Sequence, residues 1–379
     1  MKRRPILFLL FGIAFGIIGV AGHRIWWQWK ASSELDQARE AGFPTDIAAI
    51  ESRAVTRADD SGPLLRPLLD QLPQRENYWS DLDERDLEEK ASEGGKTLRR
   101  MGHALAKPSI SWPKPDPEDY VGEEVRRFEQ GGYLLAASAR LHRRAGRFEA
   151  SLAEIALLYR LAHLASSGPT LDHKIAAMRI EEAGLKELQG LLQSGVAPGR
   201  IEELANHQNP LPDWRAGFAA DFSLEYKRLR LAYLDEEKGW WESLQDQFAR
   251  LSAFAERTLA SYVRANRMTW ERLPQDLGDL RSMREAFSRR EAENRSKSGI
   301  RAMEDRAATG LAIGLPEIWG RYLSMRRLVS DSARIWQGDN AIEIDPWTGV
   351  PFLRKGNRLF SPGPTPSPKD DLTVPLPPK

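Results

Sequence analysis

Apolar residues recur along most of this chain at the spacing of an α-helix. One apolar face follows steps of four, three, four and three, and it consists of Phe148, Leu152, Ile155, Tyr159 and Ala162. A second face begins near Leu171 and ends near Leu191, before Gly195 and Pro198. Because only residues 168–170 separate the two runs, the pattern predicts two helices joined as a hairpin.

The same periodicity predicts further helices near residues 32–41, 64–72, 122–145, 217–237, 279–297 and 316–336. Alternating runs typical of strands are scarce, and proline-rich breaks interrupt the pattern at 108–117, at 210–212 and near Pro274. The predicted fold class is therefore mainly α, a bundle of helical hairpins.

A seven-residue apolar repeat marks the middle of the chain and consists of Trp241, Leu244, Phe248, Leu251, Ala255 and Tyr262, with Thr258 at one expected apolar position. Such a seam is typical of a dimeric coiled coil, and also of a long helix that packs inside its own bundle. We favour the second interpretation, because three heptads are few.

The longest apolar run extends from Pro5 to Gly22 and follows three cations, Lys2 to Arg4. At about 1.5 Å per residue it covers roughly 27 Å as a helix, close to the thickness of a bilayer core. The cations and three following tryptophans predict a single-pass anchor of the inner membrane over 1–30, with a cytoplasmic N-terminus and an extracytoplasmic body. A cleaved signal peptide is the alternative, because Val20-Ala21-Gly22 has the small residues that a signal peptidase accepts.

Composition narrows the class of the body. With 29% charged residues, 41% hydrophobic residues and a formal net charge of +1, the chain is neither a polyanion-binding protein nor a disordered polyampholyte. It contains no cysteine, which excludes disulfides, a lipid-modified cysteine and cysteine-based metal or nucleophile sites. About 350 residues after the anchor exceed one ordinary core and predict two packed subregions.

Two segments carry family resemblances. Residues 141–150, Leu-His-Arg-Arg-Ala-Gly-Arg-Phe-Glu-Ala, resemble the turn of a tetratricopeptide-like helix pair, but no second copy recurs at a period of 34. Residues 345–352, Asp-Pro-Trp-Thr-Gly-Val-Pro-Phe, resemble the C-terminal motif of type II secretion pseudopilins. That resemblance implies a β-hairpin over 339–361. It also implies calcium binding after the hairpin, but Thr365 to Pro368 replace the expected glycine and aspartate residues.

The order of anchor, helical hairpins and C-terminal motif is similar to a set of uncharacterised bacterial anchored helical proteins. We accordingly divide the chain into a transmembrane anchor (1–30), a helical region with a proline-rich linker (31–120), a helical-hairpin region (121–215), a long-helix bundle (216–338), the pseudopilin-like hairpin (339–361) and a proline-rich tail (362–379) that we expect to be disordered.

Candidate chemistry is sparse. No His-Glu-x-x-His pair or Gly-x-Ser-x-Gly stands in the chain. His163 and His173 flank one inter-helix turn, and the hypothesis that they form an acid-base or metal site involves the nearby carboxylates Asp172, Glu181 and Glu182. The alternative is a histidine that hydrogen-bonds a carbonyl or faces solvent.

Two further groups could bind ligands. The densest basic cluster consists of Arg140, Arg143, Arg144 and Arg147 and could hold phosphates such as lipid headgroups, although cations near a helix C-terminus also stabilise the helix dipole. Trp240 and Trp241 could stack on a sugar or pack in a core. Nucleic acid is excluded as a partner by the predicted topology.

These observations assign no catalytic, cofactor-binding or metal residue and predict no cofactor. The function expected from the sequence is a membrane-anchored binding or scaffold protein with a protein partner at the cell envelope. A secretion or pilus accessory protein and an envelope hydrolase are the alternatives.

Overall fold

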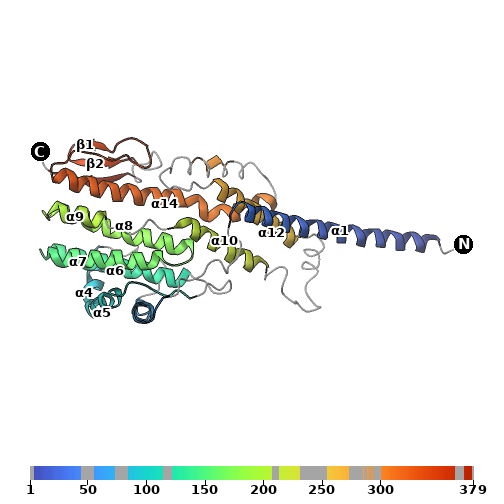
Figure 1. Ribbon diagram of the computed structural model, residues 1–379, viewed down its shortest axis with the longest axis horizontal. Helices are drawn as coiled ribbons and strands as arrows, with labels where there is room; N and C mark the ends of the chain where they lie inside the picture. Colours follow the sequence, from blue (N-terminus) through green and yellow to red (C-terminus); the bar gives the residue numbers. More distant parts are fainter. Residues whose placement is uncertain are drawn as a thin grey trace. The chain divides into compact units, whose positions relative to one another are not determined.

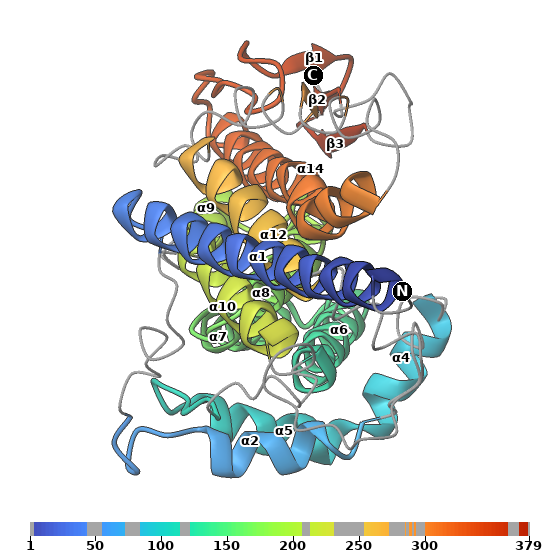
Figure 2. The ribbon, with the colours of Figure 1, turned by 90° about the vertical axis from the view of Figure 1, so that its right-hand side faces the viewer.

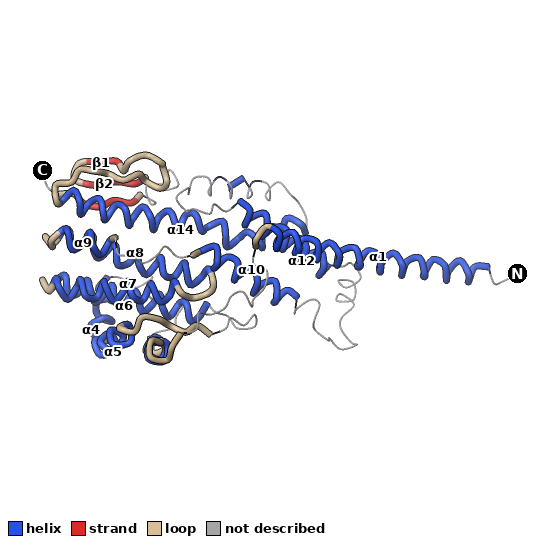
Figure 3. Tube along the Cα trace, viewed as in Figure 1, coloured by secondary structure: helices blue, strands red, loops and turns tan. Residues whose placement is uncertain are grey.

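The computed structural model describes residues 4–43, 55–72, 84–113, 122–206, 213–230, 254–272, 285, 288–289, 292, 300–362 and 371–377. Its helices are α1 (Arg4–Glu40), α2 (Gly62–Leu69), α4 (Glu84–Glu93), α5 (Gly95–Leu105), α6 (Gly122–Arg144), α7 (Phe148–Ser166), α8 (Leu171–Gln193), α9 (Pro198–Ala205), α10 (Trp214–Arg230), α12 (Phe254–Arg272) and α14 (Ile300–Trp336). The strands are β1 (Leu353–Lys355), β2 (Arg358–Ser361) and β3 (Leu372–Pro375) (Figure 1, Figure 3). The predicted mainly helical class is confirmed.

The chain folds as two compact units, and neither is continuous in sequence. The first unit consists of residues 1–50, 219–273 and 286–313, and the second of residues 51–218, 274–285 and 314–379. Helices α10 and α14 each contribute residues to both units.

In the first unit, α1 packs along α12 (Figure 2). Buried ion pairs join the two helices. Glu256 of α12 is 2% exposed and accepts a hydrogen bond of 2.8 Å from Arg24 of α1. Glu34 of α1 is 3% exposed and pairs with Arg267 at 3.1 Å and with Lys30 at 3.0 Å. Each buried carboxylate therefore has a cation beside it, as burial of a charge requires.

An aromatic cluster closes the same unit. Phe43, just beyond α1, lies 4.5 Å from Phe222 and 5.0 Å from Trp270 between ring centroids. Tyr262 stacks on Phe222 at 5.4 Å. Of the predicted heptad seam, residues 241–253 lie outside the described residues. Tyr262, the last residue of that seam, contacts Phe222 of the same unit, and the choice between a coiled coil and a bundle stays a prediction.

The second unit centres on α6, α7 and α8, which pack against one another. The predicted hairpin of α7 and α8 is confirmed, because residues 167–170 connect the two helices and the helices pack against each other. The apolar residues Leu152, Ile155, Leu188 and Leu191 are all buried. The tetratricopeptide-like segment forms the turn between α6 and α7. There Gly146 has a φ of 70°, a conformation that favours glycine after a helix end.

Three short helices of this unit have no counterpart among the predicted elements. Helix α5 carried a usable signal, because Leu98, Met101 and Leu105 recur at steps of three and four and are buried. Helix α4 is mostly polar and contacts α6. Pro198, which we interpreted as a stop, instead begins α9, because proline is well suited to the first helical position. The helix predicted for 279–297 falls largely outside the described residues.

Side chains on α14 join this helix to α8 and α9. Arg321 donates to Glu182 of α8 at 2.9 Å, and Tyr322 donates to Glu181. Arg326 donates to the carbonyl of Ala205 in α9 at 3.2 Å. The helix predicted for 316–336 forms the last part of α14, which begins at Ile300.

The C-terminal sheet is antiparallel, has the order β1-β2-β3 and lies on α14 (Figure 1, Figure 2). The expectation of disorder over 362–379 is wrong for β3. Leu372, Val374 and Leu376 are buried and alternate with half-buried positions, which supplies enough apolar contact to hold a third strand. Gln189 of α8 donates to the carbonyl of Thr373 at 2.9 Å, and Ser332 of α14 donates to that of Pro375.

In the part of the chain that the structure describes, no helix is both long enough and apolar enough to cross a bilayer. The predicted anchor over 1–30 is not supported by this finding. Its apolar run lies within α1, and the side chains of residues 4–17 lie outside the described residues.

Gly320 of α14 provides a test of how tightly the C-terminal motif packs. A Cβ added there would overlap the indole ring of Trp347, which is buried. We expect Gly320→Ala to lower the free energy of unfolding by about 1–3 kcal/mol through overpacking. Chemical denaturation measures this, with Gly199→Ala as the control, because a Cβ at Gly199 of α9 meets only Gln337 at an ordinary 3.7 Å. An equal response of both variants would contradict the packing argument.

Candidate functional site

A cavity of about 490 Å³ opens in the second unit where α2, α6 and the segment Ser109–Pro113 meet. We call it the Trp112 cavity, and it is lined by Arg66, Leu69, Asp70, Ser111, Trp112, Pro113, Glu124, Arg127 and Phe128. Its size falls within the range of roughly 300–1,000 Å³ that is usual for ligand sites.

The floor of the Trp112 cavity is apolar and aromatic. Leu69 and Phe128 are almost fully buried, and the rings of Trp112 and Phe128 lie 5.0 Å apart at an interplanar angle of 42°. The indole N–H of Trp112 donates to Ser167 at 3.0 Å. Because that polar group already has a partner, Trp112 contributes carbon surface to the cavity wall.

The rim of the cavity carries charges that pair with one another. Arg66 donates to the carboxylate of Glu124 and to the carbonyl of Ser111, and its guanidinium lies 5.6 Å from the centroid of the Trp112 ring. Arg127 pairs with Asp70 and, at 3.2 Å, with Glu123. The four ionisable residues of the lining are thus two cations and two anions.

Asp60 holds the segment that carries Trp112. Its carboxylate accepts hydrogen bonds from the hydroxyl and the backbone N–H of Ser111 and from the N–H of Gly62. Burial alone would raise the pKa of Asp60, but these bonds and the charge of Arg66 outweigh it and lower the pKa. The ionised Asp60 therefore ties Ser111 to the start of α2.

His173 stands behind the cavity wall. Its Nδ1 lies 2.6 Å from Thr170 Oγ1, and its ring meets Trp112 edge to face at 4.4 Å. Burial, with the charges of Lys174 and Arg66, lowers the pKa of His173 to about 3. The imidazole is therefore neutral at physiological pH and serves as packing for Trp112.

The predicted histidine and carboxylate site does not assemble around His173. Glu181 and Glu182 are engaged by Tyr322 and Arg321 of α14. Burial raises the pKa of Asp172, although the charges of Arg179 and Arg126 act to lower it. Among the described residues no group of three or more histidine, aspartate or glutamate side chains could hold a metal ion.

The predicted basic cluster has partners within the fold. Arg140 donates to Glu187 of α8 at 2.7 Å, and Arg143 lies 3.5 Å from the same carboxylate, which is 3% exposed. Arg144 pairs with Glu88 of α4 at 2.6 Å. These three arginines thus fasten α6 to α4 and α8, whereas Arg147 is exposed. Trp240 and Trp241 lie outside the described residues.

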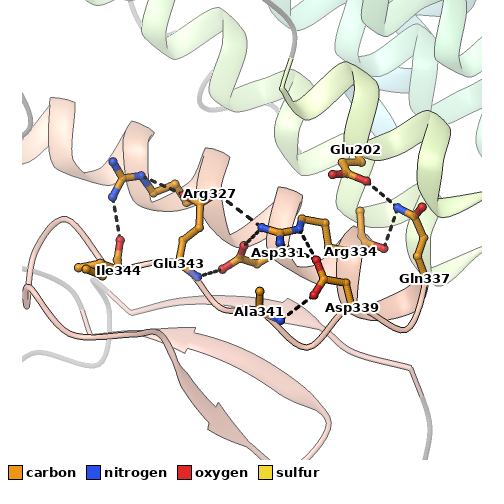
Figure 4. A network of polar contacts seen from close by, with 10 residues as sticks. Glu202, Arg327, Asp331, Arg334, Gln337, Asp339, Ala341, Glu343 and Ile344 are labelled. Carbon is orange, nitrogen blue, oxygen red and sulfur yellow. Dashed lines mark hydrogen bonds and ion pairs between the residues drawn. The ribbon is translucent and has the colours of Figure 1, made fainter.

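A second polar centre joins the end of α14 to the segment that precedes β1 (Figure 4). Asp331 is fully buried and accepts a hydrogen bond of 2.7 Å from the backbone N–H of Glu343. Arg334 lies 3.7 Å from Asp331 and donates to Asp339 at 2.9 Å. Burial is the main cause that raises the pKa of Asp331 to about 6.

Neighbouring contacts extend this network at both ends. Arg327 donates to the carbonyl of Ile344 at 2.8 Å, and Gln337 donates to Glu202 of α9 at 2.7 Å. Every partner is a side chain or backbone group of the same unit. The network therefore has an evident structural role in docking the C-terminal segment on α14.

The pseudopilin-like motif also has a structural role. Asp345 is 1% exposed, and its carboxylate accepts hydrogen bonds from the N–H of Trp347 at 3.0 Å and from the hydroxyls of Ser324 and Ser361 at 3.2 and 2.9 Å. The motif thus closes a turn and ties α14 to β2.

The Trp112 cavity is accordingly the best candidate for ligand binding, and the sequence reasoning did not identify it. The proline-rich segment was interpreted only as a break between helices, although it places Trp112 and Ser111 beside α6. Comparison with known proteins adds no assignment: a scan against protein-family models, a search of curated proteins and a search of solved structures each found no match.

Proposed function

We propose that this protein is anchored in the membrane by its N-terminal helix and binds a protein partner with its extracytoplasmic body. The observation that carries the anchor is an exposed apolar surface on α1. Ile18, Ile25 and Trp29 are 68%, 65% and 63% exposed, and Trp26 is half exposed. Folded domains rarely leave such side chains together in water, and indole rings favour the headgroup level of a bilayer.

The surrounding sequence fits the same proposal. Ile18 lies inside the apolar run from Pro5 to Gly22 that follows three cations, and Ile25, Trp26 and Trp29 lie just after that run. The same helix extends to Glu40 and packs on α12 through the buried ion pairs of Glu34 and Glu256. A lipid-embedded first part of α1 would therefore be joined to the rest of the first unit by continuous helix.

The binding role rests on the Trp112 cavity. It combines an apolar floor with a polar rim, the arrangement that is typical of ligand sites. Because a tether confines the body to the membrane surface, it raises the effective concentration of the cavity toward partners in the envelope.

The anchor is tested by topology and extraction. A reporter enzyme that is active only outside the cytoplasm is fused after residue 60, and alkaline-washed membranes are probed for the uncut chain. We expect an active reporter and retention in the membrane fraction. A reporter that is active only inside the cell, or an uncut chain in the aqueous fraction without detergent, would contradict the anchor.

The partner is tested separately by cross-linking in intact cells and pull-down from detergent extracts. The control retains residues 1–43 and carries a scrambled body, so that binding by the anchor alone is subtracted. We expect at least one envelope protein above this control. Recovery of none would remove the binding role and leave the anchor untouched.

A further inference from the structure

Helix α5 buries one face in the second unit and presents the opposite face to solvent. Its apolar residues Leu98, Met101 and Leu105 are buried. The opposite face carries cations that recur at steps of three, four and seven residues, which keep them on one side of a helix. We call this group the α5 basic row, and it consists of Lys96, Arg99, Arg100 and Lys107.

The cations of the α5 basic row reach the solvent together. Lys96, Arg99 and Arg100 are exposed, and Lys107 is half-buried. Lys107 lies just past the end of the helix, where its backbone N–H still bonds to the carbonyl of Ala104 at 3.2 Å. The row therefore continues the line of the helix.

No carboxylate neutralises this row. Residues 94–113 contain no aspartate or glutamate, and none of the four cations forms an ion pair within the part of the chain that the structure describes. Two other exposed arginines of the second unit differ, because Arg200 pairs with Glu149 at 3.2 Å and Arg179 with Glu129 at 3.1 Å. The α5 basic row is thus not a solvated face of mixed charge.

The helix dipole accounts for only part of the row. Cations near the C-terminal end stabilise a helix, and Lys107 fits that role. Lys96 instead lies in the first turn of α5, where the positive end of the dipole makes a cation unfavourable. Its presence there, beside Arg99 and Arg100, indicates that the anion for this row comes from outside the chain.

The extent of the row favours a charged surface over a single small ion. From Lys96 to Lys107 it covers about 16 Å, at about 1.5 Å per residue. A small anion could contact only one or two of these cations at a time. Anionic lipid headgroups move within the plane of a bilayer, so several can gather beneath the row without a preformed match in spacing, and clustered cations bind such surfaces.

We propose that the α5 basic row binds the anionic headgroups of a bilayer surface. The inference rests on the proposed anchor, which would keep the chain at a bilayer and so raise the effective concentration of headgroups. Each lysine or arginine near an anionic surface strengthens binding by about fivefold. Because salt screens this attraction, the contact requires anionic lipid and moderate ionic strength.

The test places the full-length chain in lipid nanodiscs with a fluorophore on one introduced cysteine. The chain contains no cysteine of its own, and Gly95→Cys puts the label beside the row, where an added Cβ meets nothing within 4 Å. Headgroup-labelled lipid quenches a fluorophore that touches the surface. We expect quenching in discs rich in phosphatidylglycerol to be about threefold stronger than in phosphatidylcholine discs, and about 0.5 M salt to remove the difference.

A triple variant with Lys96→Gln, Arg99→Gln and Arg100→Gln should lower the quenching in phosphatidylglycerol discs to the phosphatidylcholine level. The matched control removes the same net charge from exposed cations of the β1–β2 hairpin that form no ion pair among the described residues: Arg354→Gln, Lys355→Gln and Arg358→Gln. This control should leave the quenching unchanged. Thermal melting confirms that both triple variants are folded. An equal loss in both would mean that net charge alone drives the contact, and it would overturn the inference.

The disc types separate this inference from the proposed function. Retention in phosphatidylcholine discs reports the anchor alone, so a retained chain with equal quenching in both disc types would overturn the inference and leave the anchor standing. A chain that enters only phosphatidylglycerol discs, and only with the row intact, would remove the anchor and support the lipid contact.

Polyglutamate serves as the probe for an acidic polypeptide in place of lipid. It is added to the labelled chain in phosphatidylcholine discs, and we expect no change in fluorescence that depends on the row. A response that the triple variant of the row abolishes, together with no response to phosphatidylglycerol, would overturn the lipid assignment in favour of an acidic polypeptide.

Discussion

Replacement of Asp345 by alanine is expected to lower the free energy of unfolding by about 3–5 kcal/mol. The carboxylate is almost fully buried and accepts hydrogen bonds from the backbone of Trp347 and from the hydroxyls of Ser324 and Ser361. Alanine would leave three donors without an acceptor in a region that water does not reach. Chemical denaturation of the second unit, followed by tryptophan fluorescence, measures the loss.

Two further variants separate the hydrogen bonds from the turn itself. Asp345→Asn retains one acceptor oxygen and nearly the same volume, so about half of the loss should be recovered. Thr348→Ala removes only weak contacts of 3.4 and 3.5 Å to Val350 and should change stability by less than about 0.5 kcal/mol. A loss below 1 kcal/mol for Asp345→Ala would show that these hydrogen bonds do not hold the C-terminal sheet on α14.

The second large effect is an increase in the free energy of unfolding when Asp331 is replaced by asparagine. Asp331 is fully buried, and burial, with the charge of Glu343, raises its pKa to about 6 against the opposing backbone N–H of Glu343 and the charges of Arg334 and Arg327. The folded chain therefore binds a proton more readily than the unfolded chain, in which the pKa is near 3.8. Asp331 accordingly lowers the stability progressively as the pH rises from about 4 to about 6, and this penalty persists above pH 6.

The full penalty corresponds to about 3 kcal/mol, at 1.36 kcal/mol for each pKa unit. Asparagine at position 331 can still accept the N–H of Glu343 but carries no charge. We expect Asp331→Asn to be more stable than the unchanged chain by about 1–2 kcal/mol at pH 7.5, because the lost attraction to Arg334 offsets part of the gain. At pH 4 the two chains should be equally stable.

Denaturation curves at pH 4, 5, 6 and 7.5 test this difference. Asp339→Asn is the matched control, because Asp339 bonds the same Arg334 from an exposed position. The N–H of Ala341 and the guanidinium of Arg334 lower the pKa of Asp339, so its contribution is lost as the pH falls. The two variants should therefore show opposite pH trends. An Asp331→Asn chain that is less stable at pH 7.5 would mean that the ion pair with Arg334 outweighs the cost of burial.

The two variants also show which features of this protein a reader of the sequence can reach. The resemblance of residues 345–352 to pseudopilins implied a β-hairpin over 339–361, and β1 and β2 pair as an antiparallel hairpin within that range. Nothing near Asp345 in the sequence indicates that Ser324 and Ser361 bind its carboxylate, because both lie on other elements of the second unit. The same holds for Asp331, whose pKa depends on its burial and on the backbone N–H and charge of Glu343.

The candidate site shows the same division. Trp112 and the prolines around it were visible as a break between helices. The cavity exists because α2 brings Arg66 and Leu69 to that break and α6 brings Glu124 and Phe128. Arg66 and Glu124 are 58 positions apart, so no local pattern pairs them.

The sequence by itself determined the helical class and the hairpin of α7 and α8, because helix periodicity acts between residues a few positions apart. Only the tertiary structure decided that β3 joins the sheet, that Glu181 and Glu182 accept hydrogen bonds from α14, and that the Trp112 cavity is lined by paired charges. Burial and partner choice depend on residues that are distant along the chain, and their energies exist only once the elements have packed.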